Sequence, residues 1–537
     1  MSSTTVTLAR NENQALRLGQ FAHEFLAGQF PPPPAAVLAR LELFHLDCVA
    51  CAVAALALGT NAPRVLREEA FDYRRATSGS GAACFGSSVP VAPEKAVAAN
   101  CAAVRELDAN GTNFGYNPAR GATAGEFGHN DFYPVVIAAA AQREIDGRRA
   151  LLAMLLLDEI RGRLAEVFSL KTYKIDHVVH GAIASAVVYG ALLGATPAQI
   201  ESALGLLVAH YVPFRAIRAG QQLSDSKGAS AALSTEMAVI CVHRALRGFV
   251  GPADIFRNPQ ALFCLFQPPT RANESPFDLT LTTGGDDFAI VGMHFKLGLY
   301  EHQSAGAIEG LLQLLGAHPD VLAAAERIRA VRITIYEPAF GIIADPAKRD
   351  PRTRQSADHS LAYIVATLLR KAIEQHTSGW RELMLVPADY DDTALFHPLT
   401  RALMQRIELR HGGAEYDRLY PDGIPTSLEI DCDGGGTLAS GLVMYPAGHA
   451  RSASGNLLSL LDHKFALLAG LGVDDVAGLR RRLTNLADRT PGEIAALYSF
   501  PIRGLPDGTN AAGTQPDPPR DDDPATTARP TEAAPIG

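Results

Sequence analysis

Cysteine is scarce in this sequence and has no regular spacing. Seven cysteines are spread over 537 residues, and no set of them has the spacing of iron–sulfur ligands. An odd number of scattered cysteines in a large chain predicts reduced thiols rather than a disulfide framework. Cys48 and Cys51 form a C-x-x-C pair within an apolar run. We therefore interpret them as buried core residues rather than as a metal or redox pair.

The sequence also lacks long hydrophobic runs and a basic patch. Its longest apolar run, near residues 181–195, is short and rich in small residues, which is typical of a buried helix and not of a membrane span. The N-terminus has neither the apolar core of a signal peptide nor an arginine-rich amphipathic pattern. The net charge is −9, which argues against nucleic acid as a partner. We expect a cytoplasmic protein that binds neither membranes nor nucleic acids.

A long polar stretch, residues 105–136, separates two alanine-rich runs that predict helices. The stretch has no apolar periodicity of its own. A loop of this length inside a compact chain is usually functional or disordered. Disorder is disfavoured by its aromatic residues, which are Phe114, Tyr116, Phe127, Phe132 and Tyr133. We predict an active-site loop that is held between helices.

Helical periodicity dominates the chain up to about residue 270, where no convincing strand is found. The predicted helices cover residues 15–30, 35–59, 61–76, 92–106, 150–167, 178–193 and 228–247. Later in the chain, alternating β-branched residues predict a strand at 328–336. A glycine-rich turn predicts a hairpin between 428–431 and 438–445. Further helices are expected at 303–316, 360–375, 397–409 and 455–500.

The change from a purely helical pattern to a mixed pattern of strands and helices predicts the domain organisation. We expect a mostly α-helical protein with a helical domain over residues 1–284 and an α+β domain over 285–445. The helices of residues 446–502 would rejoin the first domain. Residues 503–537 are proline-rich, polar and acidic, which predicts a disordered tail.

Two polar clusters, one of them in the predicted active-site loop, contain candidate acid–base residues. Within it, Asp108, Thr112 and His129 offer a carboxylate, a hydroxyl and an imidazole for acid–base chemistry. Asp108 and Thr112 could equally cap helices or fix turns, whereas His129 is less easily explained as structural. His177 precedes an apolar helix, and a helix N-terminus favours an anionic ligand. Asp176 could simply cap that helix, and we expect either His177 or the nearby histidine at position 180 to be structural.

Two further clusters contribute cations. Lys227 begins another predicted helix, where it could pair with a substrate carboxylate, with a solvated loop lysine as the alternative. Lys296 and His302 lie at the junction of the two expected domains, where ligand sites are common, although a pair of surface side chains is the alternative. Together with the loop, these groups suit an acidic organic substrate and proton transfer. No metal-ligand motif accompanies them.

At these residues the chain resembles the MmgE/PrpD family. The resemblance extends from about residue 15 to 500. Four stretches carry it: IDHVVHGAIASAVVYGALLG, FKLGLYEHQSAGAIEG, TRQSADHSLAYIVATLL and MYPAGHARSASGNLLSLLDHKF. They are most similar to the branch that dehydrates 2-methylcitrate. The resemblance implies a large all-helical domain built from both chain ends, with a smaller α/β lid domain inserted between them. It also implies a homodimer without an iron–sulfur cluster.

The resemblance also implies site residues. The catalytic set would be Asp108, Thr112, His129 and His177, and the substrate-binding set Lys227, Lys296 and His302. The sequence departs from the family pattern in this loop. The family commonly has D-x-x-D-T, whereas Gly111 precedes the threonine here. The family's H-P-S is replaced by a histidine followed by Asn130 and Asp131, and the intervening loop is longer. These changes lie where the substrate should bind.

The implied activity is that of a hydro-lyase without metal or other cofactor, acting on a small di- or tricarboxylate such as 2-methylcitrate. A base would remove the proton alpha to a carboxylate, and an acid would protonate the departing hydroxyl. His129 and His177 would form this pair, with Asp108 orienting one imidazole and Thr112 binding the substrate. Decarboxylation of an acid such as cis-aconitate, or epimerisation, is the alternative on the same scaffold. A non-catalytic protein that binds partners through its tail is a third hypothesis.

Overall fold

The computed structural model describes residues 4–508, except for 114, 118–121, 124–127, 219–221, 324 and 435. Helices dominate the described residues, which also form one four-stranded sheet and four two-stranded sheets. The chain is therefore mostly α-helical with an α/β part, as the sequence predicts. The loop aromatics Phe114 and Phe127 and the tail beyond residue 508 lie outside the described residues.

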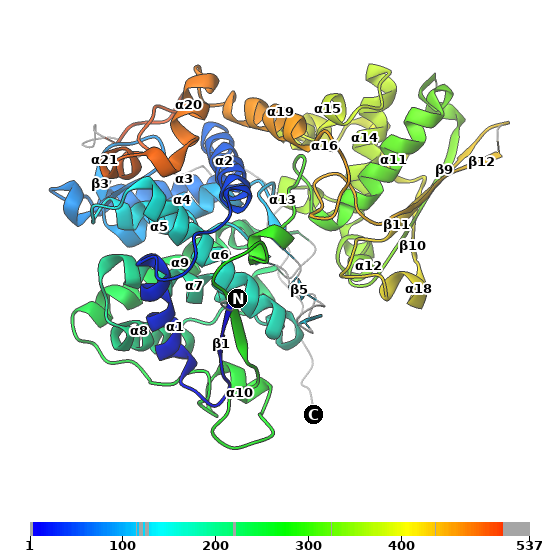
Figure 1. Cartoon of the computed structure of the whole chain (residues 1–537). Coiled ribbons are helices and arrows are strands. Elements are labelled where there is room, and N and C mark those ends of the chain that lie inside the picture. The colour runs from blue at the N-terminus through cyan, green and yellow to red at the C-terminus, as the bar shows by residue number, and fades with distance from the viewer. Residues whose placement is uncertain are drawn as a thin grey trace, which may run out of the picture.

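Helices near the start of the chain form the larger body in Figure 1. Its central helices are α2 (Ala35–Ala57), α4 (Pro93–Arg105), α6 (Gly147–Val167), α7 (Val178–Leu193) and α9 (Asp225–Leu246). All five are predicted from the sequence. Every residue of α7 is buried, which explains its apolar character on all sides. The neighbouring helices α4, α6 and α8 (Pro197–His210) pack around α7 and α9.

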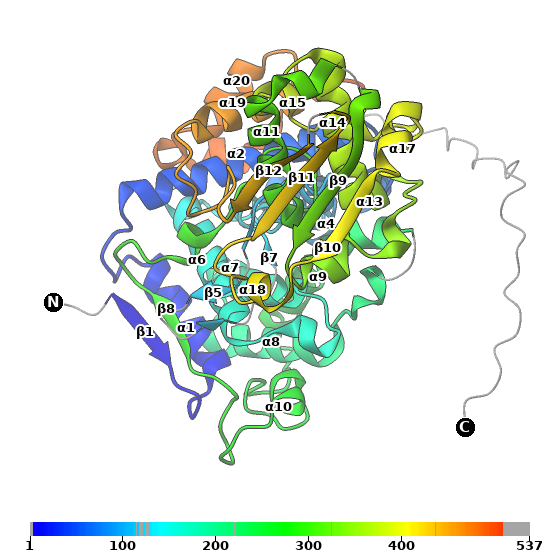
Figure 2. The ribbon, with the colours of Figure 1, turned by 90° about the vertical axis from the view of Figure 1, so that its right-hand side faces the viewer.

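A mixed sheet forms the second body, on the right of Figure 1. Its strand order is β10-β9-β11-β12, with β9 and β10 parallel and the other pairs antiparallel. The strands are β9 (Ile328–Ile335), β10 (Ile407–His411), β11 (Thr426–Cys432) and β12 (Gly436–Val443). Helices α11 (Ala305–Ala317) and α14 (Leu361–Gln375) pack beside them. In Figure 2 the sheet faces the viewer, with the larger body behind and below it.

Two expectations about strands are wrong. The run at 397–409 is not one helix, because α17 (Pro398–Met404) ends and β10 begins at Ile407. The parallel pairing of β10 with β9 overrides the helical pattern. Strands also occur before residue 270: β1 (Thr5–Leu8) pairs with β8 (Leu279–Thr282). No hairpin signal marks β1, because its partner lies far along the chain.

The two ends of the chain pack together. Helix α19 (Leu457–Ala469) lies against α2. From α19, the buried ammonium of Lys464 donates to the Asp47 carboxylate at 2.5 Å, to the Ala109 carbonyl at 2.6 Å and to the Lys296 carbonyl at 2.7 Å. A single side chain thus joins α2, the loop and the segment that enters the second body.

No helix among the described residues is, by itself, both long and apolar enough to cross a membrane. The pair formed by α2 and α3 (Asn61–Asp72) meets the criterion of length and composition only jointly, and the two helices are bent by 87°.

Candidate active site

The predicted active-site loop borders a pocket that also takes residues from the second body. All the predicted site residues except Lys296 line it. The lining consists of Arg105, Asp108, Thr112, His129, His177, Arg215, Arg218, Leu223, Lys227, Glu301, His302, Ile342, Lys348 and His359. Lys227, Lys296 and His302 are all buried, so none of them is the solvated surface side chain considered as the alternative.

Short strands within the loop bring two of the predicted residues together. Strand β4 (Thr112–Asn113) pairs antiparallel with β7 (Gly128–His129), and Thr112 lies opposite His129. The hydroxyl of Thr112 donates to the Gly128 carbonyl at 3.1 Å. The main chain of Thr112 also pairs with that of His294, at 3.0 and 2.7 Å. The loop therefore closes on itself and fixes both residues in the pocket wall.

Asp108 is an ionised carboxylate surrounded by cations. One of its oxygens accepts from Arg105 and from Lys296, and the other lies 3.1 Å from the Lys227 ammonium. Burial alone would raise the pKa of the Asp108 carboxyl. The positive charges of Arg105, Lys296 and Lys227 outweigh burial and hold this pKa well below its usual range.

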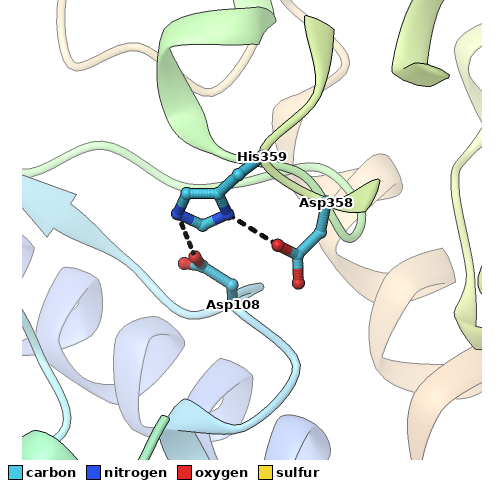
Figure 3. A group of neighbouring side chains, drawn as sticks. All are labelled: Asp108, Asp358 and His359. Atoms are coloured by element: carbon cyan, nitrogen blue, oxygen red, sulfur yellow. Dashed lines mark hydrogen bonds and ion pairs between the residues drawn. The ribbon is translucent and has the colours of Figure 1, made fainter. Parts of the chain in front are cut away.

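His359, which the sequence does not single out, lies between two carboxylates (Figure 3). Its Nδ1 donates to the Asp358 carboxylate at 2.6 Å, and its Nε2 lies 3.4 Å from Asp108 Oδ2. Burial and the charge of Lys227 lower the pKa of His359 to about 3. In the described residues, the imidazole against Asp108 is thus His359, and not His129 or His177 as expected. The only sequence signal was its place in the stretch TRQSADHSLAYIVATLL.

Asp108, Asp358 and His359 are spaced closely enough to hold a metal ion. The ammonium of Lys227 already lies among them, 3.1 Å from each carboxylate and 3.2 Å from His359 Nδ1. The positive charge of this ammonium neutralises the two carboxylates, as the charge of a metal ion would. The donor set therefore fits a lysine-centred ion cluster better than a metal centre.

His129 and His177 face each other, with ring centroids 5.4 Å apart. Among the residues that the structure describes, His129 Nδ1 and His177 Nε2 are buried and have no hydrogen-bond partner. Burial lowers the pKa of both imidazoles well below the usual value, and the cations around them lower it further. Both rings are therefore neutral, and each has a nitrogen that can accept a proton.

Asp176 contacts both the start of α7 and the imidazole of His177. Its carboxylate accepts from the Val178 amide at 3.3 Å, which caps α7, and lies 3.5 Å from His177 Nδ1. Arg218 binds the same carboxylate at 2.5 Å. The nearby His180 is buried and absent from the pocket lining. We therefore propose that His180 is the structural one of the two histidines.

The pocket carries more positive charge than the sequence indicates. Arg105, Arg215, Arg218 and Lys348 line it in addition to the predicted residues. No local pattern marks these four, because arginine and lysine are common in loops and at helix ends. Such a concentration of cations suits a ligand with several carboxylates.

Two models of one protein family match this chain. The MmgE/PrpD N-terminal domain model matches residues 17–274, and the MmgE/PrpD C-terminal domain model matches residues 300–487. The pocket takes residues from both matched segments.

Relatives named 2-methylcitrate dehydratase are similar to this chain. The protein from Cupriavidus necator is 26% identical over 343 residues, which are 61% of this chain and 64% of the relative. The protein from Escherichia coli (strain K12) is 24% identical over 331 residues, which are 60% of this chain and 64% of the relative. The protein from Salmonella typhi is 23% identical over 401 residues, which are 71% and 77%. The match therefore spans slightly less than two thirds of the length of the first two relatives.

Proposed function

The chain belongs to the MmgE/PrpD family, and from this premise we propose that it is a hydro-lyase that dehydrates a small di- or tricarboxylic acid such as 2-methylcitrate. One observation carries the proposal. His129 and His177 are neutral, have unpartnered ring nitrogens among the described residues, and face each other in a pocket rich in cations. The dehydratase relatives support the same reaction class.

The reaction needs a base, an acid and positive charge. One imidazole removes the proton alpha to a carboxylate, and the electron pair of that C–H bond forms a charge of enolate type. The cations around Asp108 stabilise this charge. The charge then forms the C=C bond as the C–O bond breaks, and the hydroxyl leaves as water with a proton from the other imidazole. Bound carboxylates raise the pKa of both histidines, so that one can hold that proton.

The remaining residues hold this pair and the substrate. Thr112 pairs with His129 and lines the pocket, which supports a role of its hydroxyl in binding a substrate oxygen. Lys227 and His302 line the pocket. The Lys227 ammonium lies between the carboxylates of Asp108 and Asp358 and stabilises the ionised form of both. Lys296 lies behind Asp108 and is absent from the lining. We therefore propose that Lys296 positions Asp108, while Lys227 and His302 contact the substrate.

A decarboxylase or epimerase of a related acid is the second candidate, because the loop departs from the family pattern. A side chain at Gly111 would collide with Phe44, whose ring lies 2.5 Å from an ideal Cβ. Asn130 and Asp131, which replace the residues after the family histidine, both accept hydrogen bonds from the buried Asn110. The residues that depart from the family pattern are thus buried and hydrogen-bonded within the loop. This arrangement is compatible with a site that binds a different substrate.

A substrate panel tests the proposal. The purified chain is incubated with 2-methylcitrate, citrate and cis-aconitate, in chelator and without added metal, and the products are followed by mass spectrometry. Loss of water from a 2-methylcitrate-like acid is the expected result. Released carbon dioxide would establish the decarboxylase, and solvent deuterium in an unchanged acid the epimerase. Absence of turnover with all carboxylic acids would contradict both candidates.

A further inference from the structure

Lys348 ends a short 3-10 helix, Pro346–Lys348, in the second body and lines the pocket. We propose that Lys348 is a specificity-determining residue that binds one carboxylate of the substrate. This inference rests on the proposed function and deepens it, because it assigns a recognition site for one particular carboxylate. Neither the resemblance nor the local sequence pattern marks this residue.

The other cations around the pocket are already engaged by the protein. Lys227 lies 3.1 Å from both Asp108 and Asp358. Lys296 and Arg105 bind Asp108, and Arg105 also lies 3.5 Å from Asp131. The buried carboxylates therefore offset much of the charge of all three residues, including Lys227 where it contacts the substrate.

The two arginines of the segment Arg215–Arg218 are engaged as well. Arg218 binds Asp176 at 2.5 Å and the Ser230 hydroxyl at 3.1 Å. Arg215 also has an interaction partner. Both arginines therefore already have a partner within the protein.

Lys348 differs from these groups. Its side chain is partly buried, and its ammonium has no hydrogen bond or ion pair with any residue that the structure describes. The acidic group with the largest electrostatic effect on Lys348 is Glu301, which lines the same pocket. An ammonium that is partly removed from water and has no partner loses part of its hydration without compensation. A ligand carboxylate would remove that cost and form a charge-assisted hydrogen bond.

The position of Lys348 in the chain adds a second argument. His129 and His177 belong to the segment matched by the N-terminal family model, whereas Lys348 belongs to the segment matched by the C-terminal model. A substrate that reaches the two histidines and Lys348 together would be held by both segments. Lys348 would thus bind a second or third carboxylate at a distance from the carbon that reacts between the two histidines.

Binding of unreactive acids to the full-length chain tests this proposal. Propane-1,2,3-tricarboxylate has no hydroxyl and cannot lose water. Glutarate lacks its central carboxylate, and methylsuccinate lacks one terminal carboxylate. Calorimetric titration gives Kd for each acid with the wild-type chain, with Lys348→Gln, with Lys348→Arg and with the matched control Arg349→Gln. Arg349 is exposed, adjacent, and absent from the pocket lining.

We expect Lys348→Gln to weaken binding of the tricarboxylate by ~10-fold or more, because a charge-assisted hydrogen bond is lost. The same variant should weaken one of the two dicarboxylates less than ~2-fold, because that acid lacks the group that Lys348 binds. Lys348→Arg should retain most of the affinity, and Arg349→Gln should behave as the wild type.

Other outcomes overturn the inference. Equal weakening of all three acids by Lys348→Gln, matched by Arg349→Gln, would mean that only long-range charge acts. Unchanged binding in Lys348→Gln, with normal wild-type binding, would remove Lys348 and leave the proposed function intact. Failure of the wild-type chain to bind any of the three acids would remove the proposed function and Lys348 with it.

Discussion

Lys296 holds Asp108 at two points. Its ammonium donates to the main-chain carbonyl of Asp108 at 2.9 Å and forms an ion pair with the carboxylate of the same residue. Asp108 has a φ of +49°, a left-handed conformation that non-glycine residues seldom adopt. The lysine therefore fixes both the backbone and the side chain of a residue in the pocket wall.

Replacing Lys296 by methionine should reduce stability and turnover together. Breaking a buried ion pair from one side costs ~3–5 kcal/mol, because the remaining charge stays buried. Urea unfolding and steady-state kinetics measure the two effects. The double variant Lys296→Met with Asp108→Asn should regain part of the stability but no turnover. A rise in KM with normal stability and kcat would instead make Lys296 a direct substrate ligand.

Replacing His129 or His177 by glutamine should remove most turnover without unfolding the protein. Loss of a general acid or base typically costs ~10²–10⁴-fold in rate. Among the described residues, each imidazole has a ring nitrogen without a partner, so its loss should have little effect on Tm. Kinetics and thermal unfolding of the two variants provide the check. Wild-type activity in either one would exclude that histidine from the acid–base pair.

His180 provides the contrast. Burial lowers the pKa of His180 to about 3, whereas in the unfolded chain it is about 6.5. Between these values the unfolded state binds a proton that the folded state does not, so stability falls as pH falls by ~1.4 kcal/mol per pH unit. His180→Leu should keep its activity and lose less stability between pH 6.5 and 4.5. Urea unfolding at each pH measures this, and identical slopes in variant and wild type would contradict it.

Glu301 should make ligand binding depend on pH. Burial raises the pKa of Glu301 to about 7, although Lys296 opposes the shift. As pH rises through 7, this carboxyl gains a negative charge in a pocket proposed to bind polyanions. The Kd of propane-1,2,3-tricarboxylate should therefore increase between pH 6.5 and 8 in the wild-type chain and stay flat in Glu301→Gln. A parallel increase in both would assign the effect to another group.

Truncation tests the contribution of residues 504–508 and of the tail that follows them. The carbonyls of Pro506, Asp507 and Gly508 accept from Arg67 at 2.7 Å, Ser87 at 2.5 Å and Arg74 at 3.0 Å. A chain that ends after residue 508 should keep its Tm and turnover, whereas one that ends after residue 503 should lose Tm. Three lost hydrogen bonds, at ~1 kcal/mol each, account for the difference. Lost turnover in the longer truncation would favour a functional tail.

Much of the helical framework could be predicted from local pattern. Helix α7 begins and ends within a residue of the predicted run, because its apolar character is set by its own sequence. The hairpin of β11 and β12 is likewise marked by its glycine-rich turn. Strands β1 and β10 could not be predicted, because each is stabilised by a partner distant in sequence.

The candidate site was only partly accessible to sequence analysis. Asp108, Thr112 and His129 lie in one unusual loop, and His177 and Lys227 lie at the starts of predicted helices. His359 and Lys348 come from the second body, in segments with no chemical pattern of their own. Their roles follow from which charges the folded chain neutralises and which it leaves available. That property belongs to the assembled pocket and not to any stretch of sequence.

Because Lys464 lies late in the chain, the loop that carries Asp108 can be fully anchored only near the end of synthesis. The ribosome makes Asp47, Ala109 and Lys296 long before it makes Lys464, yet this ammonium binds all three segments at once. A nascent chain can form α2 and α7 early, since domains begin to fold while translation continues. The loop that carries Asp108 acquires its last anchor only when α19 leaves the exit tunnel. A chain released before α19 is made would therefore lack this anchor of the loop.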